Sequence, residues 1–392
     1  MSEPVPLWLD CDPGHDDAFA ILLAAYHPGI KLLGISTVHG NASLEKTTRN
    51  ALSVLAAIGK HDDVAVFPGA ARGLCRPAVH ATEIHGESGL DGTSLLPPPP
   101  PDRLLVATSP DHPSAVEAMA SALRSCAPGT AWIAATGALT NVAALFAAHP
   151  DLAARVKGLT VMGGSVGGGF TPAPMGVVDG VPRVGNYTQW AEFNVLIDPE
   201  AAAALFHDSV LAAKTTLVPL DLTHLVLATK KVQELLLYGP PCERGREGQP
   251  REGRGRSDLR VMLVELLNFF AGTYRDKFGI TEGPPLHDPL AVAAILTGTE
   301  HEIPFYDYDS KSPEGASRKE RFSVEVVIEG SLEDALEHNT QTGRTLVKLL
   351  PPGSEGVRIP RGLDIPLFWK VIEECCEQAD EVNKKVLSKP AN

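Results

Sequence analysis

Short apolar runs typical of buried strands alternate with longer runs of helical spacing along this chain. VPLWL precedes DDAFAILLAAY, KLLGISTV precedes LEKTTRNALSVLAAIG, AWIAA precedes LTNVAALFAAH, and GLTVMGG precedes DPEAAAALFH. Continuous apolar strands separated by helices are what a parallel sheet covered on both faces requires. We therefore predict an α/β fold with an open, mostly parallel central sheet and helices on both faces.

The length of 392 residues suits one large α/β domain or two smaller ones. Because no internal repeat or linker divides the sequence, we predict a single domain over residues 1–392. Residues 239–258 are polar, rich in glycine and without periodicity, which is typical of a loop insertion. The region beyond Pro304 is predicted to add edge strands in FSVEVVI and TLVKLL and a closing helix from Asp364.

The net charge of -14 argues against binding to nucleic acid or to an anionic membrane, because both would repel the protein. A small neutral or cationic ligand, or a metal ion, fits this charge better. The sequence shows no apolar run near the roughly 20 residues that span a bilayer, and its start lacks the pattern of a signal peptide. We expect a cytoplasmic protein whose six cysteines, which lack C-x-x-C spacing, are reduced.

Four aspartates crowd the turn DCDPGHDD between the first predicted strand and its helix: Asp10, Asp12, Asp16 and Asp17. The dipole of a helix N-terminus stabilises each carboxylate by only about 0.3–1 kcal/mol, too little to offset their repulsion. A bound cation would offset it, and a site made of oxygen donors favours Ca²⁺ or Mg²⁺. The alternative is that these aspartates are helix caps and solvated turn residues.

Polar groups also follow other predicted strands. Asn41 comes after LLGISTVHG, TGALTN follows AWIAA, and LHDP opens a later helix. NYTQWAEFN places two asparagines and Glu192 in an apolar setting. Ligands of open α/β sheets bind beyond the carboxyl ends of the strands. Amide and carboxylate groups gathered there suit a polyhydroxylated ligand, since each hydroxyl needs a donor and an acceptor.

Together these motifs resemble the nucleoside hydrolases, which cleave the N-glycosidic bond of ribonucleosides with water. DCDPGHDDAFAILLA is similar to the family's N-terminal signature. TVHGN, IHGESGLDG, ATGALTNVA, VMGGS, AEFNVLIDPEAA, VPLDLTH and HDPLAV follow in the family's order, over roughly residues 5 to 300. The fungal and bacterial uridine- or inosine-uridine-preferring branch is the most similar.

The resemblance implies a Rossmann-like nucleoside hydrolase fold and hydrolysis of uridine, inosine or other nucleosides to free base and ribose, as in nucleoside salvage. It implies a small-molecule nucleoside substrate and a homodimer or homotetramer. It also implies a Ca²⁺ ion that activates the attacking water, with Asp12, Asp17, Asp288 and the backbone carbonyl of Thr136 as its protein ligands. Asp12 matches the general base as well, and Asp10 is expected to orient the loop.

Further roles come from the same resemblance. The residues that match substrate-binding positions toward the ribose are Asp16, Asn41, Asn186, Glu192 and Asn194. Residues expected near the base are His85, Met162, Tyr274 and Phe278, although the last two, at i and i+4, suit a helix core equally well. His287 matches the acid that protonates the leaving base, which favours pyrimidine or broad base use.

One further departure from the family and two alternative functions remain. The segment 167–185 is longer than its counterpart in compact members of the family and is predicted to be a second insertion. Because it directly precedes Asn186, the assignment of Asn186 is less secure than that of Glu192. A phosphatase of the haloacid dehalogenase type would use a D-x-D such as Asp10-Cys11-Asp12, but Pro13-Gly14 and the lack of its downstream partners oppose it. The chain could also be a Ca²⁺-dependent ribose-binding protein without activity.

Overall fold

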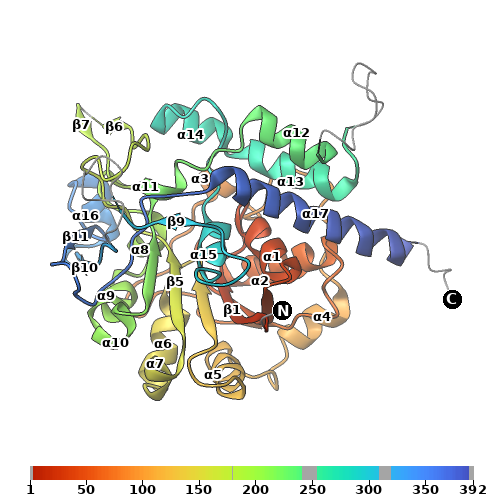
Figure 1. Ribbon diagram of the computed structural model, residues 1–392, viewed down its shortest axis with the longest axis horizontal. Helices are drawn as coiled ribbons and strands as arrows, with labels where there is room; N and C mark the ends of the chain where they lie inside the picture. The colour runs from red at the N-terminus through yellow and green to blue at the C-terminus, as the bar shows by residue number, and fades with distance from the viewer. Residues whose placement is uncertain (1–2, 179, 241–253, 309–318, 388–392) are drawn as a thin grey trace.

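The core of the protein is a six-stranded sheet in which every strand runs parallel to its neighbours (Figure 1). The computed structural model describes residues 3–178, 180–240, 254–308 and 319–387. In the sheet order β3-β2-β1-β4-β5-β8, the strands are β3 (Val66–Pro68), β2 (Ile30–Thr37), β1 (Val5–Cys11), β4 (Trp132–Ala135), β5 (Gly158–Met162) and β8 (Thr215–Val218). The predicted fold class is confirmed.

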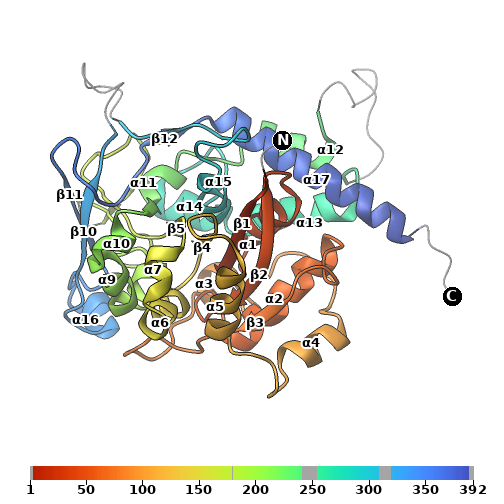
Figure 2. The same ribbon diagram turned by 60° about the horizontal axis from the view of Figure 1, so that its bottom comes forward.

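Helices cover both faces of this sheet, as Figures 1 and 2 show from two directions. Leu7 and Leu9 of β1 pack into a cluster with helices α1 (Asp17–Tyr26), α2 (Leu44–Ala57), α13 (Asp258–Phe269), α15 (Asp288–Ala294) and α17 (Ile365–Leu387). Trp8, between them, faces a second cluster with α5 (Ala115–Ser125), α6 (Thr140–Ala148), α7 (Asp151–Arg155) and α9 (Pro199–His207). Successive side chains of a strand point to opposite faces, and both faces of β1 are covered, so the strand is apolar from Leu7 to Leu9.

Shorter elements complete the chain. The remaining helices are α3 (Thr82–His85), α4 (Pro101–Ala107), α8 (Phe193–Leu196), α10 (Ser209–Ala212), α11 (Leu220–Thr223), α12 (Lys230–Tyr238), α14 (Ala271–Phe278) and α16 (Leu332–Glu337). Three two-stranded antiparallel sheets are formed by β6 (Val177–Val178) with β7 (Val181–Pro182), β9 (Phe305–Tyr306) with β12 (Gly362–Leu363), and β10 (Phe322–Val326) with β11 (Thr345–Leu349). No helix in these described ranges is long and apolar enough to cross a membrane.

The strands predicted in FSVEVVI and TLVKLL both form, but they do not pair directly with the central sheet. β10 pairs with β11 and is linked to the central sheet through single bridges, of Phe322 with Val357 and of Arg358 with Thr216. The free edge of β8 is met by the segment around Arg358, whose backbone N–H donates to Thr215 O (2.9 Å) and whose carbonyl accepts from Leu217 N (2.8 Å). With that edge bridged, the buried side of β10 packs on α9. The closing helix is confirmed as α17.

The predicted insertion at 167–185 contains the β6–β7 pair, with residue 179 outside the described residues. Arg183, just after it, donates to Gly185 O (2.7 Å) and lies over the Phe278 ring at 5.4 Å, so the segment packs against α14. Most of the predicted loop at 239–258 lies outside the described residues, which resume at 254.

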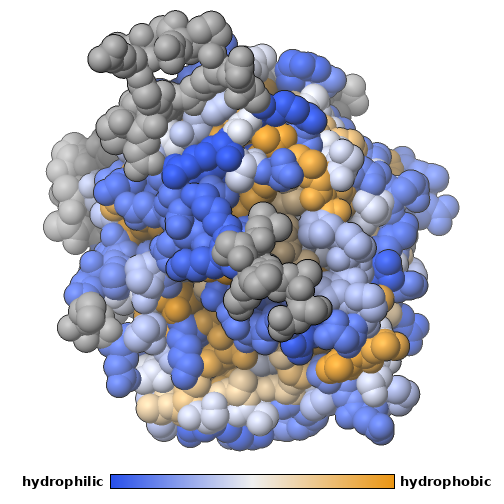
Figure 3. All heavy atoms as spheres, turned by 90° about the vertical axis from the view of Figure 1, so that its right-hand side faces the viewer, coloured by the Kyte–Doolittle hydropathy of each residue, from blue (hydrophilic) through white to orange (hydrophobic). Residues whose placement is uncertain are grey.

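Helix α17 is fastened to the rest of the fold by a buried arginine. Arg260 of α13 is fully buried and bonds Asp380 (2.6 Å), Glu373 (2.9 Å) and Glu377 (3.1 Å) of α17, and the carbonyl of Leu236 in α12 (2.7 Å). These hydrogen bonds give acceptors to all three nitrogen atoms of the guanidinium. The molecular face that includes the end of α17 is largely hydrophilic with separate hydrophobic patches (Figure 3).

We predict that Arg260→Ala lowers the free energy of unfolding by about 3–5 kcal/mol, because it leaves buried carboxylates without their cation. Chemical denaturation followed by circular dichroism measures the change. The matched control is Arg124→Ala, which removes an arginine paired with Asp151 (2.9 Å) at the surface and should leave the unfolding midpoint unchanged. Equal effects of the two substitutions would contradict the structural role of Arg260.

Candidate active site

A cavity with about 510 Å³ of empty space, partly open to solvent, lies beyond the carboxyl ends of the central strands. All predicted site residues line it except Asp12, Asp17 and Phe278. Its lining residues are Asp16, Asn41, Ala81, Ile84, His85, Thr136, Met162, Asn186, Glu192, Phe193, Asn194, Phe270, Tyr274, His287 and Asp288. Side chains that are far apart in the sequence therefore share one space, as the parallel sheet requires.

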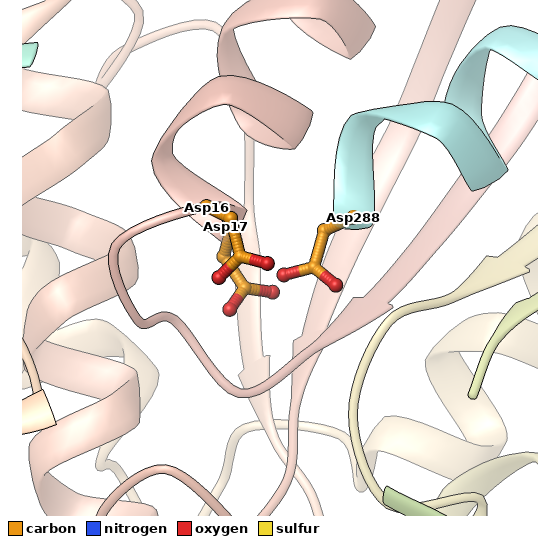
Figure 4. Close-up of side chains that lie close together, drawn as sticks. All are labelled: Asp16, Asp17 and Asp288. Atoms are coloured by element: carbon orange, nitrogen blue, oxygen red, sulfur yellow. The ribbon is translucent and has the colours of Figure 1, made fainter. Parts of the chain in front are cut away.

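Three carboxylates meet on one side of this cavity. Oxygen atoms of Asp16, Asp17 and Asp288 all lie within 4.8 Å of one another, and all three residues are buried. Asp16 and Asp17 stand at the start of α1, and Asp288 is the first residue of α15. Figure 4 shows the Asp288 carboxylate pointing toward the other two. Two helix N-termini thus bring the acidic groups together.

Asp12 stands beside this group rather than in it. Its Oδ2 accepts from the backbone N–H of Asn41 (2.7 Å), whereas Oδ1 is buried and has no hydrogen-bond partner among the described residues. A Cβ atom on Gly40 would lie 2.0 Å from Oδ2, and one on Gly137 would lie 2.6 Å from Oδ1. The glycines of TVHGN and ATGALTN therefore make the room in which this carboxylate lies.

Thr136 and Asp17 are linked directly. The Thr136 hydroxyl donates to Asp17 Oδ1 (2.9 Å), while the backbone N–H of Gly14 donates to Asp17 Oδ2 (2.9 Å). The Thr136 carbonyl accepts from Asn194 Nδ2 (3.0 Å). A carbonyl oxygen has two lone pairs, so this one retains a second for a cation.

The carboxylates have strongly perturbed acidities. Burial, followed by the charge of Asp17, raises the pKa of Asp16 to about 7. Burial also raises the pKa of Asp288 well above its usual range, with Asp16 and Asp17 adding to the effect, and it raises the pKa of Asp12 in the same way. Without a cation the cluster resists full ionisation. Oxygen donors only, and one buried oxygen without a partner, fit a hard divalent cation.

Asp10 has a different environment and does not line the cavity. It is fully buried, and its Oδ1 accepts from Asn141 Nδ2 (2.8 Å) and from the Ser36 hydroxyl. Burial raises its pKa to about 7. A phosphatase of the haloacid dehalogenase type needs this first aspartate as an accessible nucleophile. The position of Asp10, bonded to β2 and α6, does not suit that role.

Glu192 and its neighbours form another polar side. The Glu192 carboxylate caps α8, accepting from the backbone N–H groups of Gly164 (2.7 Å), Asn194 (2.9 Å) and Val195 (3.1 Å), and burial raises its pKa to about 7. Asn186 Oδ1 accepts from Phe193 N (2.9 Å). Backbone donors thus hold these groups rigidly before any ligand arrives.

Aromatic rings and imidazoles make the remaining side. His287 places Nδ1 2.6 Å from the Thr223 hydroxyl, and its Nε2 is buried with no partner in the described part of the chain. Burial, then His224 and His85, lower its pKa well below the usual range, so the ring is neutral. Tyr274 lies 5.4 Å from His287, centroid to centroid. Phe278 stacks behind Tyr274 at 5.2 Å, outside the cavity, so it supports the wall rather than forming it.

The sequence analysis missed the lining residues Ala81, Ile84, Phe193 and Phe270, and two residues that contact the lining, Thr223 and His15. Phe270 lines the cavity, and its spacing of four from Tyr274 was the available signal. Thr223 lies in VPLDLTH, but nothing in that motif tells which histidine its hydroxyl reaches. His15 lies inside DCDPGHDD and bonds His85 (2.9 Å), a contact that spans 70 residues.

Comparison with known proteins matches this chain to nucleoside hydrolases. Residues 7–370 fit the family model described as inosine-uridine preferring nucleoside hydrolase. The chain is 37% identical over 383 residues to the uridine nucleosidase of Saccharomyces cerevisiae, covering 97% of this chain and 98% of that one. It is 36% identical over 294 residues to the pyrimidine-specific ribonucleoside hydrolase RihA of Salmonella arizonae, covering 74% and 79%.

Solved structures agree on the fold. The purine-preferring ribonucleoside hydrolase from Gardnerella vaginalis superposes with a TM-score of 0.70 at 23% identity, covering 96% of this chain and 99% of that one. A plant nucleoside hydrolase superposes with a TM-score of 0.69 at 24% identity, covering 95% and 99%.

We predict that a divalent cation stabilises the protein more at high pH than at low pH. The folded pKa of Asp16, about 7 without a cation, lies above its unfolded value of about 3.9. The metal-free fold is therefore stabilised by protonation, and this contribution is lost as the pH rises through about 7. A bound cation takes over that stabilisation as the carboxylates ionise.

The measurement is the gap in melting temperature between metal-loaded and chelator-treated protein, at about pH 5.5 and about pH 8. The gap should widen at the higher pH, with metal content checked in each sample. A gap that stays constant would show that the carboxylates do not bind the cation.

Proposed function

Since this chain belongs to the inosine-uridine preferring nucleoside hydrolase family and is a nucleoside N-ribohydrolase, we propose that it hydrolyses uridine, and also inosine, to ribose and the free base. The observation that carries the proposal is one cavity with buried carboxylates on one side and the neutral His287 on another. In such a site the carboxylates can bind the sugar on one side, while His287 faces the base on the other.

The cation is proposed to be Ca²⁺, held by the carboxylates of Asp12, Asp17 and Asp288 and by the Thr136 carbonyl. The support is the all-oxygen donor set and the buried Asp12 Oδ1, which no group in the described ranges of the chain hydrogen-bonds. When bound, such a cation lowers the pKa of a water molecule and offsets the charge of the carboxylates.

Asp12 is proposed as the general base. Its Oδ2 is fixed by the Asn41 N–H, and Oδ1, which has two lone pairs, can both face the cation and accept a proton from the attacking water. The neighbouring glycines leave room for the carboxylate and the Asn41 N–H orients it, so little reorganisation is needed when the proton moves.

The ribose is proposed to bind between the carboxylates and the Glu192 side. Asp16 and Asn41 would accept from and donate to its hydroxyls, and Asn186, Glu192 and Asn194 would hold its other end. Cleavage of an N-glycosidic bond develops positive charge on the sugar, and buried carboxylates stabilise that charge. Their fixed hydrogen bonds make this stabilisation available without rearrangement.

His287 is proposed to serve the leaving base. When the Thr223 hydroxyl donates to Nδ1, the proton of the neutral ring lies on Nε2, which has no partner among the described residues. This N–H can donate a hydrogen bond to the base as the glycosidic bond breaks and the base gains negative charge. To protonate the base outright the ring acts as the imidazolium, which returns to the neutral form when it gives up the Nε2 proton. Tyr274 and Phe270 would flank the base.

The direct test is ribose release from uridine and inosine by the full-length protein loaded with Ca²⁺. Release of phosphate from a phosphomonoester without release of ribose would favour a phosphatase, and binding of ribose with neither product would favour an inactive binding protein.

We predict that Asp12→Asn lowers kcat for ribose release by at least about a thousandfold, because the amide cannot accept the water's proton. The exposed Asp111→Asn is the matched control and should leave kcat unchanged. Near-normal turnover of Asp12→Asn in a folded sample would remove Asp12 from the role of base.

We also predict that His287→Ala lowers kcat/KM far more for uridine than for p-nitrophenyl riboside. The nitrophenolate leaves without a proton, whereas uracil needs one, so only the uridine reaction loses the contribution of roughly a hundredfold or more from acid catalysis. Equal losses on both substrates would mean that His287 positions the sugar or the fold instead.

A further inference from the structure

His15 links two sequence motifs beneath the cavity wall. It is fully buried, its Nε2 lies 2.8 Å from the carbonyl oxygen of Asp91, and its Nδ1 lies 2.9 Å from Nδ1 of His85. DCDPGHDD and IHGESGLDG therefore meet through a chain of two imidazole rings. His85, the last ring of that chain, lines the cavity.

The protons of this chain can be placed by elimination. A carbonyl oxygen only accepts, so His15 Nε2 must carry a proton. In the neutral ring the other nitrogen, Nδ1, then has a lone pair, and His85 Nδ1 must donate to it. When His85 is also neutral, its Nε2 carries no proton and has a lone pair. No described residue forms a hydrogen bond with this Nε2. His15 is fully buried and stacked on an aromatic ring, surroundings that favour a neutral imidazole.

The surroundings hold both ends of the chain in place. The His15 ring stacks on Phe269 with centroids 4.9 Å apart and an interplanar angle of 6°. The carboxylate of Asp91 accepts from Glu87 N (2.9 Å) and from the Ser88 hydroxyl (2.5 Å), which fixes the turn that presents the Asp91 carbonyl. A Cβ atom on Gly14 would lie 2.8 Å from His85 Nδ1, so the glycine leaves room for the approach of the ring.

We propose that His15 is a positioning residue that keeps Nε2 of His85 as a hydrogen-bond acceptor, and that this acceptor selects nucleosides whose base carries a ring N–H. Uracil and hypoxanthine have such a donor, whereas cytosine and adenine present a ring nitrogen acceptor. His85 shares the cavity with His287 and Tyr274, on the side that the proposed function gives to the base. The substrate in this proposal is taken from the proposed function, whereas the acceptor character of His85 Nε2 follows from its hydrogen bond with His15.

Nitrogen NMR of the full-length protein with labelled histidine tests the imidazole chain. In the wild type, His85 should show a bare Nε2 and a protonated Nδ1, and His15 the reverse. A protonated Nε2 on His85 would overturn the proposal, whatever the protein hydrolyses. In His15→Leu, which removes the acceptor facing His85, both tautomers of His85 should become populated.

Kinetics test the selection, with uridine and cytidine as substrates of equal size and opposite polarity at the ring nitrogen. His15→Leu should lower the ratio of kcat/KM for uridine over cytidine by roughly tenfold, the value of one hydrogen bond. His15→Asn offers an amide oxygen in place of Nδ1 and should restore most of the ratio. A ratio that stays at the wild-type value in folded His15→Leu would overturn the selective role.

The two failures can be told apart. If the wild type releases ribose from neither uridine nor inosine, the proposed function fails, while the NMR spectrum still reports on the imidazole chain. If ribose is released and the spectrum shows the other tautomer, the function stands and the role of His15 falls.

Discussion

The repulsion among buried carboxylates is the constraint on which the rest of this structure depends. Burial raises the pKa values of Asp12, Asp16, Asp17 and Asp288, and the charges of neighbouring aspartates raise those of Asp12, Asp16 and Asp288 further. Burying ionised groups without compensation is costly, so these carboxylates either keep protons or need a compensating cation such as the one proposed. The parallel sheet brings the groups to one edge, and Gly40 and Gly137 leave the space that a side chain would fill.

Much of this arrangement could be predicted from the sequence, because its signals are local. Apolar strands followed by helices predicted the sheet, and polar residues after strands predicted the edge at which the cavity lies. The sequence could not tell that Asp16, rather than Asp12, joins Asp17 and Asp288 in the closest group, since a side-chain rotation decides it. The roles assigned to these residues stay predictions.

The misses have a common physical origin. The sequences of β10 and β11 alternate apolar and polar residues, as strands do. Whether they pair with the central sheet depends on which segment lies along the edge of β8, and the Arg358 segment lies there. The contacts of Thr223 with His287 and of His15 with His85 join residues 64 and 70 positions apart. Pairings of this kind depend on tertiary packing, and composition and periodicity carry no signal for them.

The attachment of α17 has a consequence for how such an enzyme can diversify. The carboxylates lie on the sheet and its adjoining helices, whereas Phe270 and Tyr274 lie at the end of α13 and in α14, a layer held by α12 and α17 through Arg260. Substitutions in this outer layer can reshape the wall facing the base without disturbing the acidic edge. The architecture thereby separates the wall proposed to face the base from the acidic edge, and it makes the position of part of that wall depend on α17.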